Sequence, residues 1–133
     1  MSDEQAIKNA LDQWLTGLDS GDLETMIETC DPHAVVCNQN QPTTVGLQPI
    51  RDKYGPRIDR ASFKSGFELQ HIQIFGDIAL LAGRFSVQAT DKASGQTSSG
   101  AGRLVLGYRR NPDGAWKMVL DVDNNDDTDG VAQ

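Results

Sequence analysis

The chain has 133 residues, of which 38% are hydrophobic, and its 19 acidic and 12 basic side chains give a formal charge of −7. This length fits one domain around one hydrophobic core, and the composition is typical of a globular protein. The acidic balance argues against nucleic-acid binding, which needs a basic surface, and no apolar run approaches the roughly 20 residues that span a bilayer. We therefore expect no nucleic acid and no membrane as partners. Because no secretory signal is visible in the first thirty residues, we expect a cytoplasmic protein.

The charge is unevenly distributed along the chain. Residues 1–31 carry eight acids and one base, residues 32–120 carry eleven bases and six acids, and residues 121–133 carry five aspartates and no base. The central part is therefore basic and lies between two acidic ends. The negative total argues against nucleic acid but leaves a small anionic ligand open.

The first sixty residues predict three helices and one short strand, because apolar residues recur at helical spacing between turn and cap residues. The expected helices cover about residues 3–18, 23–31 and 47–60, and the strand covers residues 34–37. Ser2 and Asp22 can cap the first two helices through their side-chain oxygens. The pair Gly55-Pro56 is expected to break or kink the third helix.

From residue 63 onward, apolar and polar residues alternate with a period of two, which predicts long strands. The expected strands are Phe63–Phe75, Ile78–Thr90, Ser99–Arg110 and Ala115–Asp123. Helices followed by a strand meander indicate an α+β class, and such long strands must curl over the helices into a cone-shaped antiparallel sheet. We expect a single domain over residues 1–124 and an acidic tail over residues 125–133.

Strict alternation divides each strand into two faces. In the last strand it groups Trp116, Met118, Leu120 and Val122 on one face and Lys117, Val119, Asp121 and Asp123 on the other. The helices can cover only one side of the sheet, and the other side is too apolar to remain exposed. We therefore expect a homodimer through that sheet face.

Three titratable residues are candidates for acid–base chemistry. Asp121 and Asp123, two residues apart on one face, could share a proton, so that one acts as general acid or base. His71 could titrate near neutral pH inside a pocket. The alternatives are a solvated strand end for the two aspartates and a surface position for the histidine.

Arg84 lies in an otherwise apolar run and could bind a carboxylate or phosphate inside the cone, or could pair with Asp121 or Asp123. Asn38 begins a polar loop that could supply amide contacts at the rim of the cone. Tyr54 could belong to the pocket wall or to the core.

We expect neither a metal nor a cofactor. Cys30 and Cys37 do not combine with the two histidines at a zinc-binding spacing, so two reduced thiols are favoured. Residues 125–130 match the first half of a calcium loop, but the closing glutamate is missing and a solvated acidic tail is favoured.

Several short motifs occur in order between residues 4 and 124. They are Leu18–Glu24, Cys30–Pro32, Val45–Leu47 ahead of Tyr54, Phe75–Asp77, Tyr108–Arg110 and Asp113–Val119. Together with the order of elements, they resemble the nuclear transport factor 2-like superfamily. This superfamily includes SnoaL-like polyketide cyclases, ketosteroid isomerases and the association domain of calcium/calmodulin-dependent protein kinase II. The resemblance implies a conical α+β (cystatin-like) fold, commonly dimeric, with a small-molecule pocket between helices and sheet.

Compared position by position, the catalytic residues of the isomerase-type members are replaced. Trp14 occupies the position of their tyrosine, Cys37 that of their basic aspartate, and Leu106 that of their protonated aspartate. Proton transfer by their mechanism is therefore not expected. The kinase association domain places arginines toward a pocket, and the resemblance makes Arg84 and Arg103 their analogues here.

These observations favour a dimeric pocket protein that binds a small, partly apolar molecule, with an anionic group on that molecule as an open alternative. The expected pocket residues are Trp14, Cys37, Asn38, Tyr54, Arg84 and Arg103. A lyase-, cyclase- or isomerase-type enzyme that uses Asp121, Asp123 or His71 remains open. An association module that joins other chains is the third hypothesis.

Overall fold

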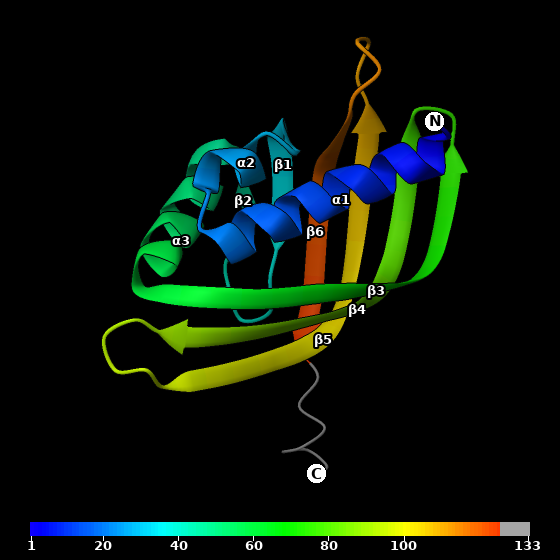
Figure 1. Cartoon of the computed structure of the whole chain (residues 1–133). Helices are drawn as coiled ribbons and strands as arrows, with labels where there is room; N and C mark the ends of the chain where they lie inside the picture. The colour runs from blue at the N-terminus through cyan, green and yellow to red at the C-terminus, as the bar shows by residue number, and fades with distance from the viewer. Residues whose placement is uncertain (126–133) are drawn as a thin grey trace.

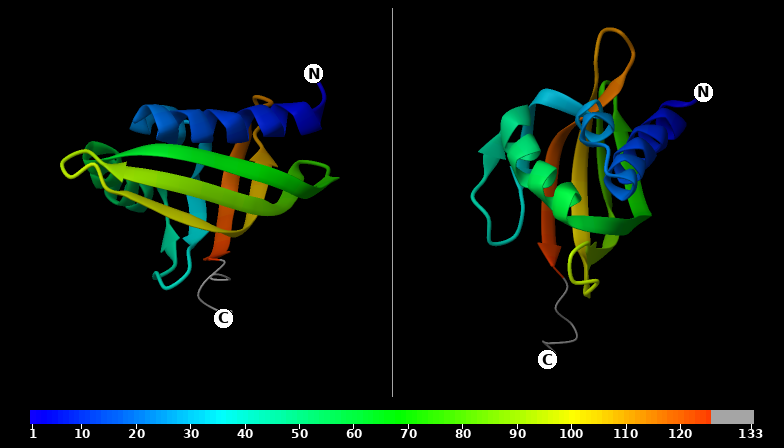
Figure 2. Two further views of the ribbon diagram at one scale, coloured as in Figure 1. Left: turned by 60° about the horizontal axis from the view of Figure 1, so that its bottom comes forward. Right: turned by 60° about the vertical axis from the view of Figure 1, so that its left-hand side comes forward.

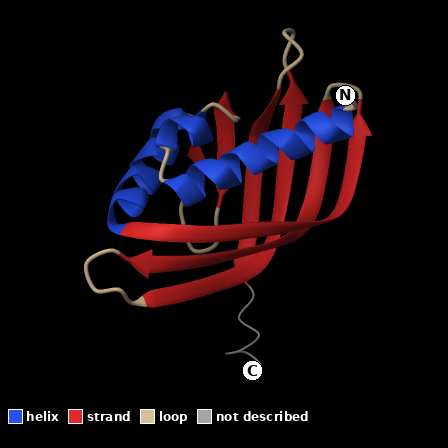
Figure 3. Cartoon of the chain, viewed as in Figure 1, coloured by secondary structure: helices blue, strands red, loops and turns tan. Residues whose placement is uncertain are grey.

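The computed structural model describes residues 1–125 and confirms the predicted α+β class (Figure 1). Three helices lie on one side of a curved, six-stranded sheet (Figures 2 and 3). The elements are α1 (Asp3–Ser20), α2 (Leu23–Ile27), β1 (Cys30–Cys37), β2 (Thr44–Val45), α3 (Leu47–Arg60), β3 (Ala61–Phe75), β4 (Ile78–Asp91), β5 (Thr97–Arg110) and β6 (Trp116–Asn125). Residues 126–133, which hold most of the predicted acidic tail and calcium-type spacing, lie outside the described residues.

The strand order of the sheet is β2-β1-β6-β5-β4-β3, and all neighbours are antiparallel except β1 and β6. The four predicted long strands are confirmed, with ends within two residues of the expected ones. Strands β3, β4 and β5 have 15, 14 and 14 residues, and strands of that length twist and curl. The parallel pairing of β1 with β6 places the loop that follows β1 beside the C-terminal end of β6.

Local interactions set the starts of the first two helices as the sequence predicts. The Ser2 hydroxyl accepts a hydrogen bond from the backbone N–H of Gln5 at 3.1 Å, and the Asp22 carboxylate caps α2 in the same way. The expected end of the second helix near residue 31 is wrong, because α2 ends at Ile27 and β1 begins at Cys30 rather than at Ala34. The expected break of the third helix is wrong, because α3 runs continuously through Pro56. Ile50 and Ile58 are buried on either side of this proline, so packing at both ends offsets the backbone hydrogen bond that proline cannot make.

The core lies between α1 and the concave face of the sheet. Ile7 and Leu11 of α1 belong to one buried cluster with Leu81 of β4, Leu106 of β5 and Met118 of β6. Fully burying one such side chain stabilises the fold by roughly 1.5–3 kcal/mol, so this cluster fixes α1 across the strands. The sheet is thereby held in its curved shape, which leaves a hollow between the helices and the outer parts of β3, β4 and β5.

A β-bulge in β6 overturns the predicted division of that strand into two faces. Gly107 pairs with Leu120, but the next residue of β5, Tyr108, pairs with Met118, so Val119 is an extra residue. An extra residue reverses the alternation beyond it. Met118, Asp121 and Asp123 therefore all line the concave side. Strict alternation had placed Met118 on one face and the two aspartates on the other.

The opposite face of the sheet is open in the single chain. It exposes Leu80 and Val105, whose accessible fractions are 44% and 41%. The homodimer through this face stays a prediction. Within residues 1–125, no helix is both long enough and apolar enough to cross a membrane.

Candidate functional site

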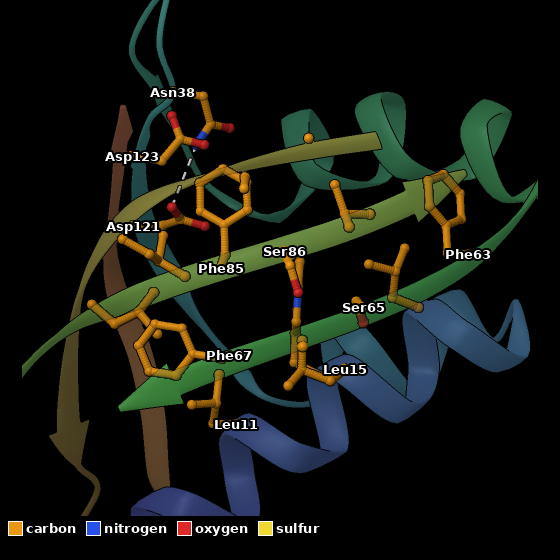
Figure 4. Close-up of a pocket in the computed structure, with 18 of the residues that line it drawn as sticks. Leu11, Leu15, Asn38, Phe63, Ser65, Phe67, Phe85, Ser86, Asp121 and Asp123 are labelled. Carbon is orange, nitrogen blue, oxygen red and sulfur yellow. Dashed lines mark hydrogen bonds between the residues drawn. The ribbon is translucent and has the colours of Figure 1, made fainter. Parts of the chain in front are cut away.

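A cavity of about 1330 Å³ opens between α1, α3 and the concave face of the sheet (Figure 4). Helix α1 and strands β3, β4 and β5 supply most of its apolar surface. We call six of these residues the apolar wall: Leu11, Leu15, Phe63, Phe67, Phe85 and Leu104. Their large side chains can pack against a ligand with an apolar body.

A group of polar side chains lies at the end of the cavity where β1, β6 and α3 meet. We call Asn38, Lys53, Asp121 and Asp123 the polar cluster. Figure 4 shows Asn38, Asp121 and Asp123 of this cluster. The Asn38 Nδ2 donates a hydrogen bond to Asp121 Oδ1 at 3.4 Å, and Lys53 Nζ donates one to Asn38 Oδ1. The backbone N–H of Gln39 donates to Asp123 Oδ1 at 2.8 Å. The loop after β1 is thus tied to both carboxylates of β6.

The surroundings of Asp121 favour its protonated form. Burial raises the pKa of Asp121 to about 6, and repulsion from Asp123 acts in the same direction. The charge of Lys53 and the hydrogen bond from Asn38 oppose this rise. A carboxyl group with a pKa close to physiological pH can both accept and donate a proton, which is what general acid–base chemistry requires.

Helix α3 contributes two cations and an aromatic ring to the cavity. Lys53 Nζ lies 5.4 Å and Arg57 Cζ lies 5.8 Å from the centre of the Tyr54 ring, and Trp14 meets the same ring edge-on at 5.2 Å. Burial and then the nearby charge of Arg57 lower the pKa of Lys53, against the attraction of the two aspartates. Burial raises the pKa of the Tyr54 hydroxyl, which therefore remains protonated at neutral pH.

The structure brings five of the predicted site residues together at the cavity: Trp14, Asn38, Tyr54, Asp121 and Asp123. Arg84 also contributes to the lining. Its backbone pairs with Arg103 of β5 on one side and with Glu68 of β3 on the other. Arg103 is exposed and does not line the cavity.

Two other candidates lie away from the cavity. Cys37 does not line it, and its Sγ accepts a hydrogen bond from the Thr43 hydroxyl at 3.7 Å. His71 is exposed, because Gln70 is an extra residue in β3, between the pairs Leu69–Gly83 and His71–Ala82. Because of this second bulge, His71 pairs with Ala82 of β4 rather than with a residue of the concave face. Its side chain therefore lies on the open side of the sheet.

The sequence reasoning missed Lys53 and Arg57 as cavity residues. Together with the buried Ile50 and with Tyr54, they occupy positions i, i+3, i+4 and i+7 of α3, the spacing of one helix face. The sequence could have indicated both residues as cavity residues, because they share a helix face with an isoleucine that belongs to the core.

The position of Asp121 adds to the comparison with the isomerases. Leu106, which the resemblance equates with their protonated aspartate, pairs directly with Asp121 across β5 and β6. A carboxyl group with a raised pKa is therefore present on the strand next to the expected one.

Comparisons with known proteins place the chain in a family. The family model of the SnoaL-like domain matches residues 7–121. A conserved protein from Planctomyces limnophilus has a similar structure, with a TM-score of 0.87, 17% identity and coverage of 93% of this chain and 98% of that one. A ketosteroid isomerase-like protein from Erwinia carotovora atroseptica follows with a TM-score of 0.79, 20% identity and coverage of 94% and 98%.

A nuclear transport factor 2-like superfamily protein from Salmonella enterica serovar Typhimurium has a TM-score of 0.74, 17% identity and coverage of 93% of both chains. Identities this low show a common fold alone. A search of curated proteins by sequence found no match. The match to the family model over most of the chain shows that the chain belongs to the SnoaL-like family.

Proposed function

We propose that this protein binds a small, largely apolar molecule in the cavity between its helices and the concave face of its sheet. The observation that carries the proposal is the cavity itself, about 1330 Å³ with the apolar wall along its length and the polar cluster at one end. Ligand sites commonly combine such a wall with a few placed polar groups that orient the bound molecule.

A purely structural role for this region agrees less well with its packing. Protein interiors are packed about as densely as organic crystals, so an unfilled hollow of this size leaves apolar surface without contacts. Within residues 1–125, Asn38 is the one hydrogen-bond partner of Asp121, and it engages Oδ1 alone. A bound molecule would fill the hollow and offer the second oxygen a partner.

Asp121 favours a second candidate function, an isomerase-, lyase- or cyclase-type proton transfer on the bound molecule. Its carboxyl group lies in the cavity lining, and its pKa is raised to about 6 by burial and by Asp123. Such a group can remove a proton from carbon or oxygen and return it at another position. Asp123 and Lys53 would then stabilise the charge that moves during the reaction.

Calorimetry with 2-naphthalenemethanol, a neutral aromatic alcohol, tests the binding proposal. The variant Val87→Trp places a large side chain in the lining of the cavity, and Val45→Trp adds the same group at an exposed site outside it. We expect Val87→Trp to weaken binding at least about tenfold while Val45→Trp leaves it unchanged. Equal binding by both variants would contradict the proposal.

Hydrogen–deuterium exchange into a panel of carbonyl compounds in D₂O, followed by NMR, tests the catalytic candidate. We expect exchange catalysed by the wild type to be lost in Asp121→Asn and retained in Asp59→Asn, a change on the exposed side of α3. Exchange that survives in Asp121→Asn would exclude Asp121 as the acid–base group.

A further inference from the structure

We propose that the ligand of this cavity is an amphiphilic organic anion, with an apolar body against the apolar wall and a carboxylate held by Lys53 and Arg57 of α3. This inference rests on the proposed small-molecule function and names the chemical class of its ligand. It places the anion site on α3 rather than at Arg84, which the sequence pattern suggested, or at Arg103, which the resemblance suggested.

The charged side chains that face the cavity come from α3 and β6. Lys53 and Arg57 lie opposite Asp121 and Asp123, whereas Lys64 and Arg84 contribute to the lining from strand positions that alternate with the concave face. Protonation of Asp121 leaves the first four groups with a net positive charge, in a protein of formal charge −7. A concave, weakly polar surface focuses the field of such charges on whatever enters it.

Lys53 and Arg57 form the part of this charge that a ligand can reach. They lie one helical turn apart and flank the Tyr54 ring, and like charges at this spacing repel each other. Elsewhere in the fold, arginines such as Arg51 and Arg109 have carboxylate partners, Glu24 and Asp31 respectively.

In the part of the chain that the structure describes, Lys53 and Arg57 have no carboxylate within 4 Å. Lys53 donates to the neutral Asn38 amide alone, although an ammonium group carries three N–H donors. A carboxylate between the two side chains would occupy the remaining donors and relieve their repulsion.

The positions of the two cations also set the direction in which the ligand lies. Arg57 is exposed and lines a second, smaller cavity of about 360 Å³ together with Arg60 and Phe63, so it stands where the main cavity meets the surface. Lys53 lies one turn deeper, at the polar cluster. The carboxylate therefore lies on the α3 side near the mouth, and the apolar body extends along the wall.

Matched pairs of probes test this inference. Each pair consists of two compounds with the same apolar group, one a carboxylate and the other the corresponding primary amide. An example is 3-(2-naphthyl)propanoate with 3-(2-naphthyl)propanamide, and phenyl and decyl groups give further pairs. We expect the wild type to bind at least one carboxylate about tenfold or more tightly than its amide in low salt, because hydrogen bonds to charged groups outweigh neutral ones.

The variants Lys53→Met and Arg57→Met should each reduce that carboxylate affinity about tenfold and leave the amide affinity within about twofold. Arg60→Met is the matched control, because it removes the same charge from the same helix outside the main cavity. It should change neither affinity. Arg57 is exposed, so its variant separates ligand contact from folding even where Lys53→Met lowers stability.

The outcomes distinguish the two proposals. Amides that bind the wild type as tightly as their carboxylates would overturn the anion inference and leave the pocket function intact. A carboxylate preference that persists in both methionine variants would also overturn the assignment to α3. If no probe of any pair binds at millimolar concentration, both proposals fail.

Discussion

Replacing Asp121 by asparagine should increase the stability of the protein at neutral pH. Burial and the repulsion from Asp123 raise the pKa of this carboxyl from its ordinary 3.8 to about 6. Each pKa unit corresponds to about 1.4 kcal/mol, so the ionised carboxylate costs the folded state about 3 kcal/mol relative to the unfolded chain. The folded protein binds this proton more tightly than the unfolded chain. Its contribution to stability is therefore complete below pH 4 and is lost as the pH rises through 6.

Asparagine has nearly the same shape and carries no charge at any pH. The free energy of unfolding of Asp121→Asn should therefore equal that of the wild type near pH 4 and exceed it by up to about 3 kcal/mol at pH 8. Urea unfolding at intervals between pH 4 and 8 measures this difference. Asp59→Asn, on the exposed side of α3, controls for the loss of one negative charge. Parallel curves for the wild type and Asp121→Asn would refute the reasoning, because they would mean that folding does not perturb this carboxyl.

Three further predictions follow from other contacts. Asn38→Ala removes the hydrogen bond to ionised Asp121, so the pKa of Asp121 should rise further; a carbon-detected NMR titration of its carboxyl measures this, and a fall would contradict the role of the amide. The protein should sediment as a dimer through the open sheet face, and Leu80→Glu should make it monomeric; a wild-type monomer at micromolar concentration would exclude this interface. Asp31 is 1% exposed and accepts hydrogen bonds from Arg109 and from the backbone of His33, so Asp31→Ala should cost about 2 kcal/mol in urea unfolding. A loss below 0.5 kcal/mol, which is about the error of the method, would show that this pair contributes little.

The sequence was sufficient for the fold because each turn and cap has its own local chemistry. The hairpin at Gly76-Asp77 lies between two long alternating strands, and Gly76 has a φ of 62°, a left-handed conformation that glycine adopts without strain. Long periodic strands then leave few ways to cover the helices. The third helix was the exception, since burial on both sides of Pro56 outweighs the local preference of the Gly-Pro pair for a break.

The site was harder to predict because two bulges decide which side chains enter it. Val119 and Gln70 are ordinary strand residues, and nothing in their own chemistry marks them as extra residues. The first bulge brings Asp121 to the same side as Met118, and the second leaves His71 exposed. Period-two reasoning identifies the candidate residues but not the face on which each lies beyond a bulge.

The cations of α3 were missed for a different reason. Lys53 and Arg57 are common residues on a helix surface, and their spacing gains meaning only when the helix is seen to lie at a cavity. Arg84 of β4 drew attention because it interrupts an apolar strand, and Arg103 of β5 because of the resemblance to the kinase association domain. In the fold, Arg84 and Arg103 occupy opposite positions in the register of β4 and β5, and Arg103 is exposed.

Methyl NMR of the wild type titrated with 2-naphthalenemethanol tests the central claim most directly. Saturable binding should shift the methyl signals of Leu11, Leu15 and Leu104 of the apolar wall and leave those of the exposed Val45 and Leu80 in place. Shifts confined to Val45 and Leu80, or none at a saturating concentration of the alcohol, would contradict the claim that this cavity is the binding site.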